Sequence, residues 1–429
     1  MTKKSFAYAS KACIYEALFK LCAMKTKKKN NKKWIRKRHQ VVRDLVNLFF
    51  GGYARRKYGI TVEKHNKPDN TPYLILYNHQ TGFDQFFVGM AFREHLYYVA
   101  SEDIFSMGFL SKLIKFLVAP IPIKKQTNDP RAVINCIKVA KEGGSIAIAP
   151  EGNRTFSGKT EYIKPSITAL AKHLGLPIAF LRIEGGYGVQ PRWSDSVRRG
   201  KMRAYVSRVM HPEEYKELSD GELYDIICRE LYNDEACVSG EFRHKALAEY
   251  LERAIYVCPS CGLSEFRSEG DTIECLRCRK KVRYLPTKEL SGIDCVFPFR
   301  FVKEWYEYQT EFVNSLDLSS LGDEPLYTDS VSFSRVALYK KKEIIFKNAA
   351  LSLYKDRIAV SGCGETRVFR FDDLTAVTVL GKNKINLYHG TEVFQLSNNE
   401  RLCALKYVNL YYRYKNIKKG DENAKFLGL

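Results

Sequence analysis

The sequence has no run of about 18 uncharged residues, which is the length that a membrane-spanning helix needs. Its first twenty residues do not resemble a signal peptide. Lys11, Glu16 and Lys20 interrupt them, and they contain no small-residue cleavage site. If this protein meets a membrane, we expect it to lie on the surface.

Acidic residues are few compared with basic ones, with 48 Asp and Glu against 70 Lys and Arg and a net charge of +22. This excess implies a polyanionic partner, either nucleic acid or an anionic membrane surface. The hydrophobic fraction of 45% excludes a disordered chain, and 429 residues are enough for two or three domains. The twelve cysteines do not form a disulfide framework, because four make two CxxC pairs and the others are scattered. This usage favours a reducing compartment.

The most basic stretch is residues 25–39, which holds nine Lys or Arg in fifteen positions and includes Trp34. A basic run that carries an interfacial aromatic and is flanked by amphipathic helical patterns suits adsorption to anionic lipid. We therefore predict a membrane-associating segment over residues 1–34. The alternative is a solvated or nucleic-acid-binding arm.

Between about residues 59 and 210, short apolar runs alternate with helical patterns, as is typical of an α/β layer fold. Proline near the start and glycine beyond the end predict helices over residues 130–141 and 165–173. The predicted strands cover residues 73–77, 96–100, 119–123, 145–150 and 176–183.

One predicted strand, residues 73–77, is followed directly by Asn78 and His79, then by a polar loop and Asp84. Side chains at the carboxyl edge of an α/β sheet commonly carry the chemistry. His79 is therefore a candidate base, with Asp84 to fix its tautomer. His39 and Asp44 have the same spacing, but their segment has helical periodicity, so we interpret that pair as part of a solvated helix face.

A second strand, residues 146–149, leads into a turn that contains Glu151, Gly152, Asn153 and Arg154. Glycine lets the backbone approach a ligand closely, and the planar fork of arginine suits a phosphate or carboxylate. By itself, this turn could also be a surface loop with a local ion pair.

These stretches resemble a known family. NHQTGFD is similar to the NHx4D block of the glycerolipid acyltransferases of the lysophosphatidic acid acyltransferase type, also called 1-acylglycerol-3-phosphate O-acyltransferases. PEGNR is similar to their PEGTR block, APIPIKK to their second block and LGLPIAFL to their fourth. All four stretches occur in family order, within roughly residues 35–240.

The resemblance implies transfer of a fatty acyl group from a thioester, on coenzyme A or acyl carrier protein, to the free hydroxyl of a lysophospholipid. The expected acceptor is 1-acyl-sn-glycerol-3-phosphate, which would give phosphatidate. His79 would act as general base and Asp84 would orient it. Gly152 and Arg154 would hold the acceptor phosphate, and Glu151 would fix either the turn or the acceptor.

Two departures from the family pattern concern the acceptor site. Asn153 stands where the family usually has threonine, and this change preserves hydrogen bonding. Lys124 and Lys125 stand where the second block usually ends in arginine. Lysine can neutralise a phosphate but cannot bind it bidentately, so the acceptor headgroup is left open.

Beyond residue 240 the sequence contains two CxxC pairs, separated by residues 262–274: Cys258 with Cys261, and Cys275 with Cys278. Four thiolates at this spacing predict a closed structural zinc site, here a ribbon over residues 251–290. Two redox motifs and incidental cysteines are the alternatives.

The rest of the sequence predicts a helical linker over residues 291–334 and a mostly-β domain with a terminal helix over residues 335–429. This domain is similar to a pleckstrin-homology-like barrel, which would bind lipid or protein or simply pack on the enzyme.

Taken together, these patterns predict an α/β acyltransferase domain over residues 35–250, with a mixed sheet flanked by helices. We expect a peripheral, monotopic protein on the cytoplasmic face of a membrane, with a thioester and a lysophospholipid as substrates and no nucleic acid as partner. The rival interpretations are a nucleic-acid-associated zinc-ribbon protein and a non-catalytic lipid-binding scaffold.

Overall fold

The computed structural model describes residues 33–101, 104–105, 107–123, 130–236, 238–336, 341–420 and 426–428. The chain divides into two units, Met1–Trp34 and Ile35–Leu429, and the elements below belong to the second. Residues 1–32 of the predicted membrane-associating segment lie outside the described residues, as do Lys124 and Lys125.

The first sheet has seven strands in the order β1-β7-β6-β2-β5-β3-β4. All neighbouring pairs are parallel except β6 and β7, so the predicted mixed α/β sheet is confirmed. The central strands β2 and β5 are buried along their whole length, as expected for a sheet covered on both faces. The strands are β1 Ile60–Val62, β2 Leu74–Tyr77, β3 Leu96–Ser101, β4 Ile121–Ile123, β5 Ser145–Ile148, β6 Ile178–Glu184 and β7 Met202–Met210.

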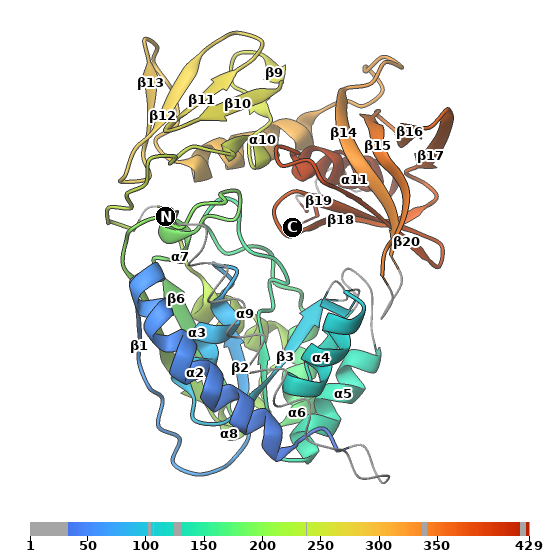
Figure 1. The fold of residues 1–429 in the computed structure, drawn as a ribbon. Helices are drawn as coiled ribbons and strands as arrows, with labels where there is room; N and C mark the ends of the chain where they lie inside the picture. The colour runs from blue at the N-terminus through green and yellow to red at the C-terminus, as the bar shows by residue number, and fades with distance from the viewer. Residues whose placement is uncertain are drawn as a thin grey trace, which may run out of the picture. The chain divides into compact units, whose positions relative to one another are not determined.

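Helices connect these strands and flank the sheet (Figure 1). Helix α2 contacts α3 and α4, while α5 contacts β4, β5 and α6. The predicted helix over residues 130–141 is confirmed, and the second predicted helix begins one residue late, at Ser166. The helices are α2 Lys37–Tyr58, α3 Asp84–Ala91, α4 Phe109–Val118, α5 Pro130–Lys141, α6 Ser166–Leu174, α7 Gly186–Val189, α8 Pro212–Tyr215 and α9 Asp220–Leu231.

One interpretation on α2 is wrong. His39 does not lie on a solvated face, because its side chain is buried against β3 and its Nδ1 lies 3.1 Å from the hydroxyl of Tyr97. Asp44 is exposed and accepts hydrogen bonds from Gln40 and Arg43 instead. The helical periodicity is correct, but it does not reveal which side of α2 faces the sheet.

The four cysteines lie in a region of short antiparallel strands, which includes a four-stranded sheet in the order β10-β11-β12-β13 and the separate pair β8 and β9. Helix α10, Val302–Ser315, comes directly after this region. The elements of the cysteine-containing region are η2 Leu251–Arg253, β8 Val257–Cys258, β9 Gly262–Leu263, β10 Phe266–Glu269, β11 Thr272–Cys275, β12 Lys281–Tyr284 and β13 Leu290–Ile293.

The carboxyl-terminal part is an antiparallel sheet curled into a half-barrel, in the order β17-β16-β15-β14-β20-β19-β18. Its first strand begins at Tyr327, inside the segment predicted as a helical linker, and the predicted terminal helix is present as α11. The elements are β14 Tyr327–Val336, β15 Glu343–Leu353, β16 Arg357–Gly362, β17 Glu365–Arg370, β18 Leu374–Leu380, β19 Lys384–His389, β20 Glu392–Ser397 and α11 Ala404–Lys418.

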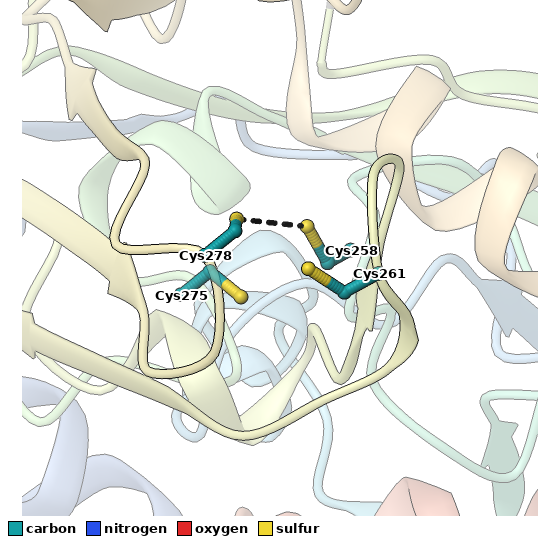
Figure 2. A group of neighbouring side chains, drawn as sticks. All are labelled: Cys258, Cys261, Cys275 and Cys278. Carbon is teal, nitrogen blue, oxygen red and sulfur yellow. Dashed lines mark hydrogen bonds between the residues drawn. The ribbon is translucent and has the colours of Figure 1, made fainter.

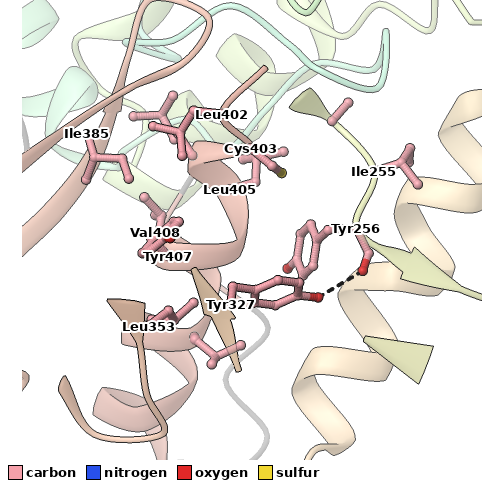
Figure 3. Packing of buried hydrophobic residues seen from close by; sticks show 14 of the residues in the cluster. Ile255, Tyr256, Tyr327, Leu353, Ile385, Leu402, Cys403, Leu405, Tyr407 and Val408 are labelled. Carbon is pink, nitrogen blue, oxygen red and sulfur yellow. Dashed lines mark hydrogen bonds between the residues drawn. The ribbon is translucent and has the colours of Figure 1, made fainter. Parts of the chain in front are cut away.

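A single buried cluster joins the cysteine-containing region, α10 and the half-barrel, and it also includes Phe156 and Trp193 from the first domain. Figure 3 shows the part of this cluster around α11, where the hydroxyl of Tyr327 donates a hydrogen bond to the carbonyl of Tyr256, 3.1 Å away. A second cluster fills the space between the first sheet and its helices. The half-barrel is therefore bonded into the same core that reaches the loops of the first domain.

Candidate active site

His79 lies at the carboxyl edge of the first sheet, in the loop after β2, and Asp84 is the first residue of α3. The Nδ1 atom of His79 lies 2.7 Å from Oδ2 of Asp84, a hydrogen-bond distance. The His79 side chain is 24% exposed, whereas that of Asp84 is fully buried. A carboxylate in this position fixes the imidazole tautomer.

The Asp84 carboxylate is held by backbone and hydroxyl donors of the same loop. It accepts hydrogen bonds from the amide of Gln80 at 2.6 Å, the amide of Thr81 at 2.9 Å and the hydroxyl of Thr81 at 2.6 Å. Because several donors fix both oxygens, the carboxylate cannot turn away from His79. The loop is therefore built around the charge of Asp84.

Asn78 has a structural role at the end of β2. Its side-chain amide donates to the carbonyl of Ile183 at 2.8 Å and accepts from the amide of Ile183 at 2.7 Å. This pair of bonds ties the end of β2 to β6, the strand beside it. The clamp thereby fixes the position of His79, the next residue.

Glu151 connects the two turns that the sequence singles out. Its carboxyl oxygens accept hydrogen bonds from the amide of His79 at 2.9 Å and from the amide of Glu161 at 3.0 Å. Strands β2 and β5 are parallel neighbours, so both turns emerge at the same edge of the sheet. Burial raises the pKa of Glu151 to about 8, although the two backbone hydrogen bonds oppose this shift.

Arg154 presents a buried cationic group toward the same loop. Its Nη1 atom has no hydrogen-bond partner among the described residues, and it lies 3.9 Å from where a Cβ on Gly82 would stand. Burial lowers the pKa of this guanidinium, and the charge of Asp84 opposes the shift. Leaving a buried donor unsatisfied is costly, so this nitrogen is suited to bind an anion.

The other members of the predicted acceptor site differ in exposure. Gly152 is exposed and has a φ of +67°, a conformation that favours glycine, whereas Asn153 is buried. The side-chain oxygen of Asn153 accepts a hydrogen bond from Arg192 at 3.4 Å. Lys124 and Lys125 cannot be placed, because they lie outside the described residues.

A cavity of about 1180 Å³ opens beside these residues. His79 and the 151–154 turn contribute to its wall, and most of the remaining wall is apolar and comes from α2 to α6 and the strands between them. Such a cavity can hold a long hydrocarbon chain. Representative apolar residues of the wall are Val46, Leu96, Ile114, Val133 and Leu170.

Two contributors that the sequence analysis missed come from the loop after α7. Gln190 accepts a hydrogen bond from the amide of Gly82 at 3.3 Å, and Arg192 donates to the carbonyl of Arg154 at 2.6 Å. They belong to no motif and no periodic pattern. Arg192 in particular bonds to Gly381, far away in the sequence, so no local signal could have identified it.

The four cysteines converge as predicted (Figure 2). Their sulfur atoms all lie within 4.8 Å of one another, and the sulfurs of Cys258 and Cys278 are 3.7 Å apart. Cys258 ends β8 and Cys275 ends β11, so each pair sits on a strand end and not at the start of a helix. Four sulfur donors at this separation fit a tetrahedral metal ion.

Comparison with known protein families finds a match in the first part of the chain. Residues 59–184 match the family described as Acyltransferase. The chain contains an acyltransferase domain. The match lies inside the segment of roughly residues 35–240 over which the sequence motifs indicate the family resemblance. It ends before the cysteine-containing region begins.

Relatives of the acyltransferase domain are distant. A chloroplastic 1-acyl-sn-glycerol-3-phosphate acyltransferase of Arabidopsis thaliana is 23% identical over 180 residues, which cover 40% of this chain and 47% of that protein. A 1-acyl-sn-glycerol-3-phosphate acyltransferase of Bacillus subtilis is 21% identical over 160 residues, which cover 37% of this chain and 77% of that protein. This chain thus spans about half the length of the plant relative.

A solved structure also matches part of the chain. The 1-acyl-sn-glycerophosphate acyltransferase of Thermotoga maritima is 19% identical, with a TM-score of 0.35, over 44% of this chain and 90% of that one.

Among the described residues of the present chain, no helix has both the length and the apolar character needed to cross a bilayer.

Proposed function

We propose that this protein transfers a fatty acyl group from a thioester to the free hydroxyl of a lysophospholipid, with 1-acyl-sn-glycerol-3-phosphate as acceptor and phosphatidate as product. The observation that carries this proposal is the meeting of three features at one sheet edge. These are the His79–Asp84 pair, the Nη1 of Arg154, which has no hydrogen-bond partner among the described residues, and an apolar cavity. The names of the curated relatives, which specify this reaction for those proteins, support the same acceptor.

The chemistry can be derived from the site. Nε2 of His79 takes the proton of the acceptor hydroxyl as its oxygen attacks the thioester carbonyl carbon. The carbon–sulfur bond of the resulting tetrahedral intermediate then breaks, and the imidazolium returns the proton to the leaving thiolate. Asp84 stabilises the imidazolium between these two steps. No serine or cysteine nucleophile is needed, because the alcohol attacks directly.

Arg154 supplies acceptor specificity in this proposal. Its Nη1 nitrogen binds the phosphate and thereby holds the hydroxyl near His79, which makes a bimolecular step effectively intramolecular. Glu151 holds the turn against the His79 loop, and Gly152 supplies its left-handed conformation. We also assign Asn153, Lys124 and Lys125 to the acceptor site, on the strength of the sequence motifs alone.

The thioester is expected on coenzyme A or on acyl carrier protein, both of which are acidic and complement a chain with a net charge of +22. The acyl chain would occupy the apolar cavity. We further propose that the protein is peripheral and binds the anionic, cytoplasmic face of a membrane. Helix α2 supports this, because its side chains Leu48 and Phe49 are 73% and 66% exposed and its last turn is basic.

The four cysteines would hold one structural zinc ion, as part of the same proposal. Four protein ligands leave no coordination position open for substrate, so the ion would stabilise the ribbon and take no part in acyl transfer. Cys258, Cys261, Cys275 and Cys278 would bind it as thiolates.

Acceptor preference tests this function most directly. We expect the wild-type protein to acylate lysophosphatidate far better than monoacylglycerol, which lacks the phosphate, and Arg154→Gln to lose most of that preference. Both acceptors should be assayed with coenzyme A and carrier-protein thioesters in parallel. Arg208→Gln, on β7, is a matched control, because Arg208 pairs with Glu214 and Glu230. A wild-type protein without acyl transfer to either acceptor would contradict the proposal.

A further inference from the structure

Arg192 joins the 151–154 turn to the half-barrel. Its guanidinium is buried and donates three hydrogen bonds, to the carbonyl of Arg154 at 2.6 Å, the side-chain oxygen of Asn153 at 3.4 Å and the carbonyl of Gly381 at 2.7 Å. The same group lies over the ring of Phe156, 4.2 Å from its centre. One side chain therefore touches both the 151–154 turn and a turn of the half-barrel.

The half-barrel side of this contact is the tight turn between β18 and β19. Gly381 has a φ of +63° there, and the next residue, Lys382, donates to the carbonyl of Ser194 at 2.6 Å and to the carboxylate of Asp195 at 2.7 Å. Charge-assisted bonds of this kind are among the stronger hydrogen bonds in proteins. The β18–β19 turn is thus fastened to the loop that carries Arg192.

The Arg192 loop is also held from the cysteine-containing region. Both terminal nitrogens of Arg253 donate to the carboxylate of Asp195, at 2.8 and 3.0 Å, and its Nε donates to the carbonyl of Glu400 at 2.6 Å. Trp193 and Phe156 belong to the buried cluster that extends through α11, part of which Figure 3 shows. The contact is therefore part of a continuous core.

The hydrogen bonds of Arg192 constrain the position of the Arg154 guanidinium, which would bind the acceptor phosphate. A carbonyl that accepts a strong bond from a buried guanidinium is fixed in space, and the carbonyl concerned belongs to Arg154 itself. Fixing that peptide group limits the directions in which the Arg154 side chain can leave the turn. Burial, followed by the nearby charge of Arg154, lowers the pKa of Arg192 to about 9, while Glu161 opposes the shift. A cation here is costly to keep and must be held by its carbonyl acceptors.

We infer that Arg192 is a positioning residue for the acceptor site, and that the β18–β19 turn of the half-barrel acts on that site through Arg192. The affinity of the acyltransferase domain for the acceptor phosphate then depends on the half-barrel. This inference rests on the proposed function and adds to it a role for a part of the chain that lies outside the family match.

The test uses the full chain and three variants, Arg192→Gln, Arg192→Lys and Lys382→Ala. For each protein, kcat and the KM for lysophosphatidate and for acyl-CoA are measured, together with the thermal unfolding midpoint. Lys355→Ala is the matched control, because Lys355 also lies in a turn of the half-barrel but bonds to Leu321 and Asp323.

We expect Arg192→Gln to raise the KM for lysophosphatidate by about tenfold or more, because small misplacements of a positioning group are costly, and to leave the KM for acyl-CoA unchanged. Arg192→Lys keeps the positive charge and one donor nitrogen, so its KM for lysophosphatidate should lie between those of wild type and Arg192→Gln. Lys382→Ala should raise the same KM by a smaller factor, and Lys355→Ala should behave as wild type.

The outcomes separate the two ideas. A wild-type chain without activity contradicts the proposed function itself. An active wild type whose Arg192 and Lys382 variants keep a normal KM for lysophosphatidate overturns the inference alone. So does a parallel rise of both KM values with a lower unfolding midpoint, since that result describes only a structural role. If Arg192→Gln does not fold, Arg192→Lys and Lys382→Ala decide the question.

Discussion

At the scale of single residues, the proposed catalytic role of His79 depends on how Asp84 is surrounded. Among the described residues, the Asp84 carboxylate is bonded to donors, namely backbone amides, the hydroxyl of Thr81 and the ring of His79. An asparagine amide at this position would turn an NH2 group toward one of these donors. The tautomer of His79 would then no longer be fixed.

We therefore expect Asp84→Asn to lower kcat for acyl transfer by about 10²- to 10⁴-fold, the contribution of general acid–base catalysis, which here needs a correctly oriented histidine. Steady-state kinetics with lysophosphatidate would measure the loss. Asp44→Asn is the matched control, because Asp44 lies at the same spacing from His39 on α2 but is exposed. Similar rates in Asp84→Asn and wild type would remove the orienting role.

A second prediction concerns Glu151 and the pH dependence of the free energy of unfolding. Its pKa rises from 4.5 to about 8 on burial, so between these values the folded state binds a proton that the unfolded state has released. The contribution of the neutral carboxyl to the free energy of unfolding is complete below pH 4.5 and disappears as the pH rises toward 8. Over this range the free energy of unfolding falls by at most about 1.4 kcal/mol per pH unit.

Glu151→Gln should remove this slope, because its amide does not titrate. The check is the free energy of unfolding of wild type and variant from pH 5 to 8, taken as a difference so that other buried acids such as Glu235 cancel. A difference that does not change with pH would contradict the assignment.

The residue scale also shows what sequence could and could not reveal. His79, Asp84 and Arg154 could be placed together, because each comes after a predicted buried strand and parallel strands end at one edge. Arg192 could not be found, since its acceptors are backbone carbonyls that tertiary structure brings near. The burial of His39 was missed for a similar reason.

At the scale of elements, local chemistry predicted boundaries well where it was strong. Helix α5 begins at Pro130, where the fixed φ of proline suits a first helical residue. The start of the half-barrel was harder to predict. Strand β14 begins at Tyr327 because it pairs with β15, and pairing between distant segments leaves little trace in the sequence.

The cysteine-containing region carries the prediction at this scale. Its sheets are small, so a metal ion should contribute much of their stability. We expect Cys275→Ser to lose most of the bound zinc and to have a lower unfolding midpoint, as measured by metal analysis and thermal denaturation. Cys363→Ser, at an exposed position of the half-barrel, should change neither. A purified wild-type protein without zinc would contradict the assignment.

At the scale of the whole molecule, the acyltransferase domain is not separate from the half-barrel. The buried cluster of the half-barrel reaches Phe156 and Trp193, and Arg192 bonds to both parts. The order of the mixed α/β sheet, the cysteine-containing region and the half-barrel could be predicted from sequence, because each has its own pattern of motifs and strands. Their contact could not, because it depends on Arg192, the β18–β19 turn and buried side chains such as Trp193, which only the tertiary structure brings together.

The central claim is that His79 takes a proton from a lipid alcohol. Its most direct test is the rate of phosphatidate formation from lysophosphatidate and an acyl thioester by wild type and by His79→Ala. We predict that wild type forms phosphatidate and that the variant is slower by about 10²- to 10⁴-fold, with an unchanged unfolding midpoint. Equal rates in the two proteins would contradict the claim.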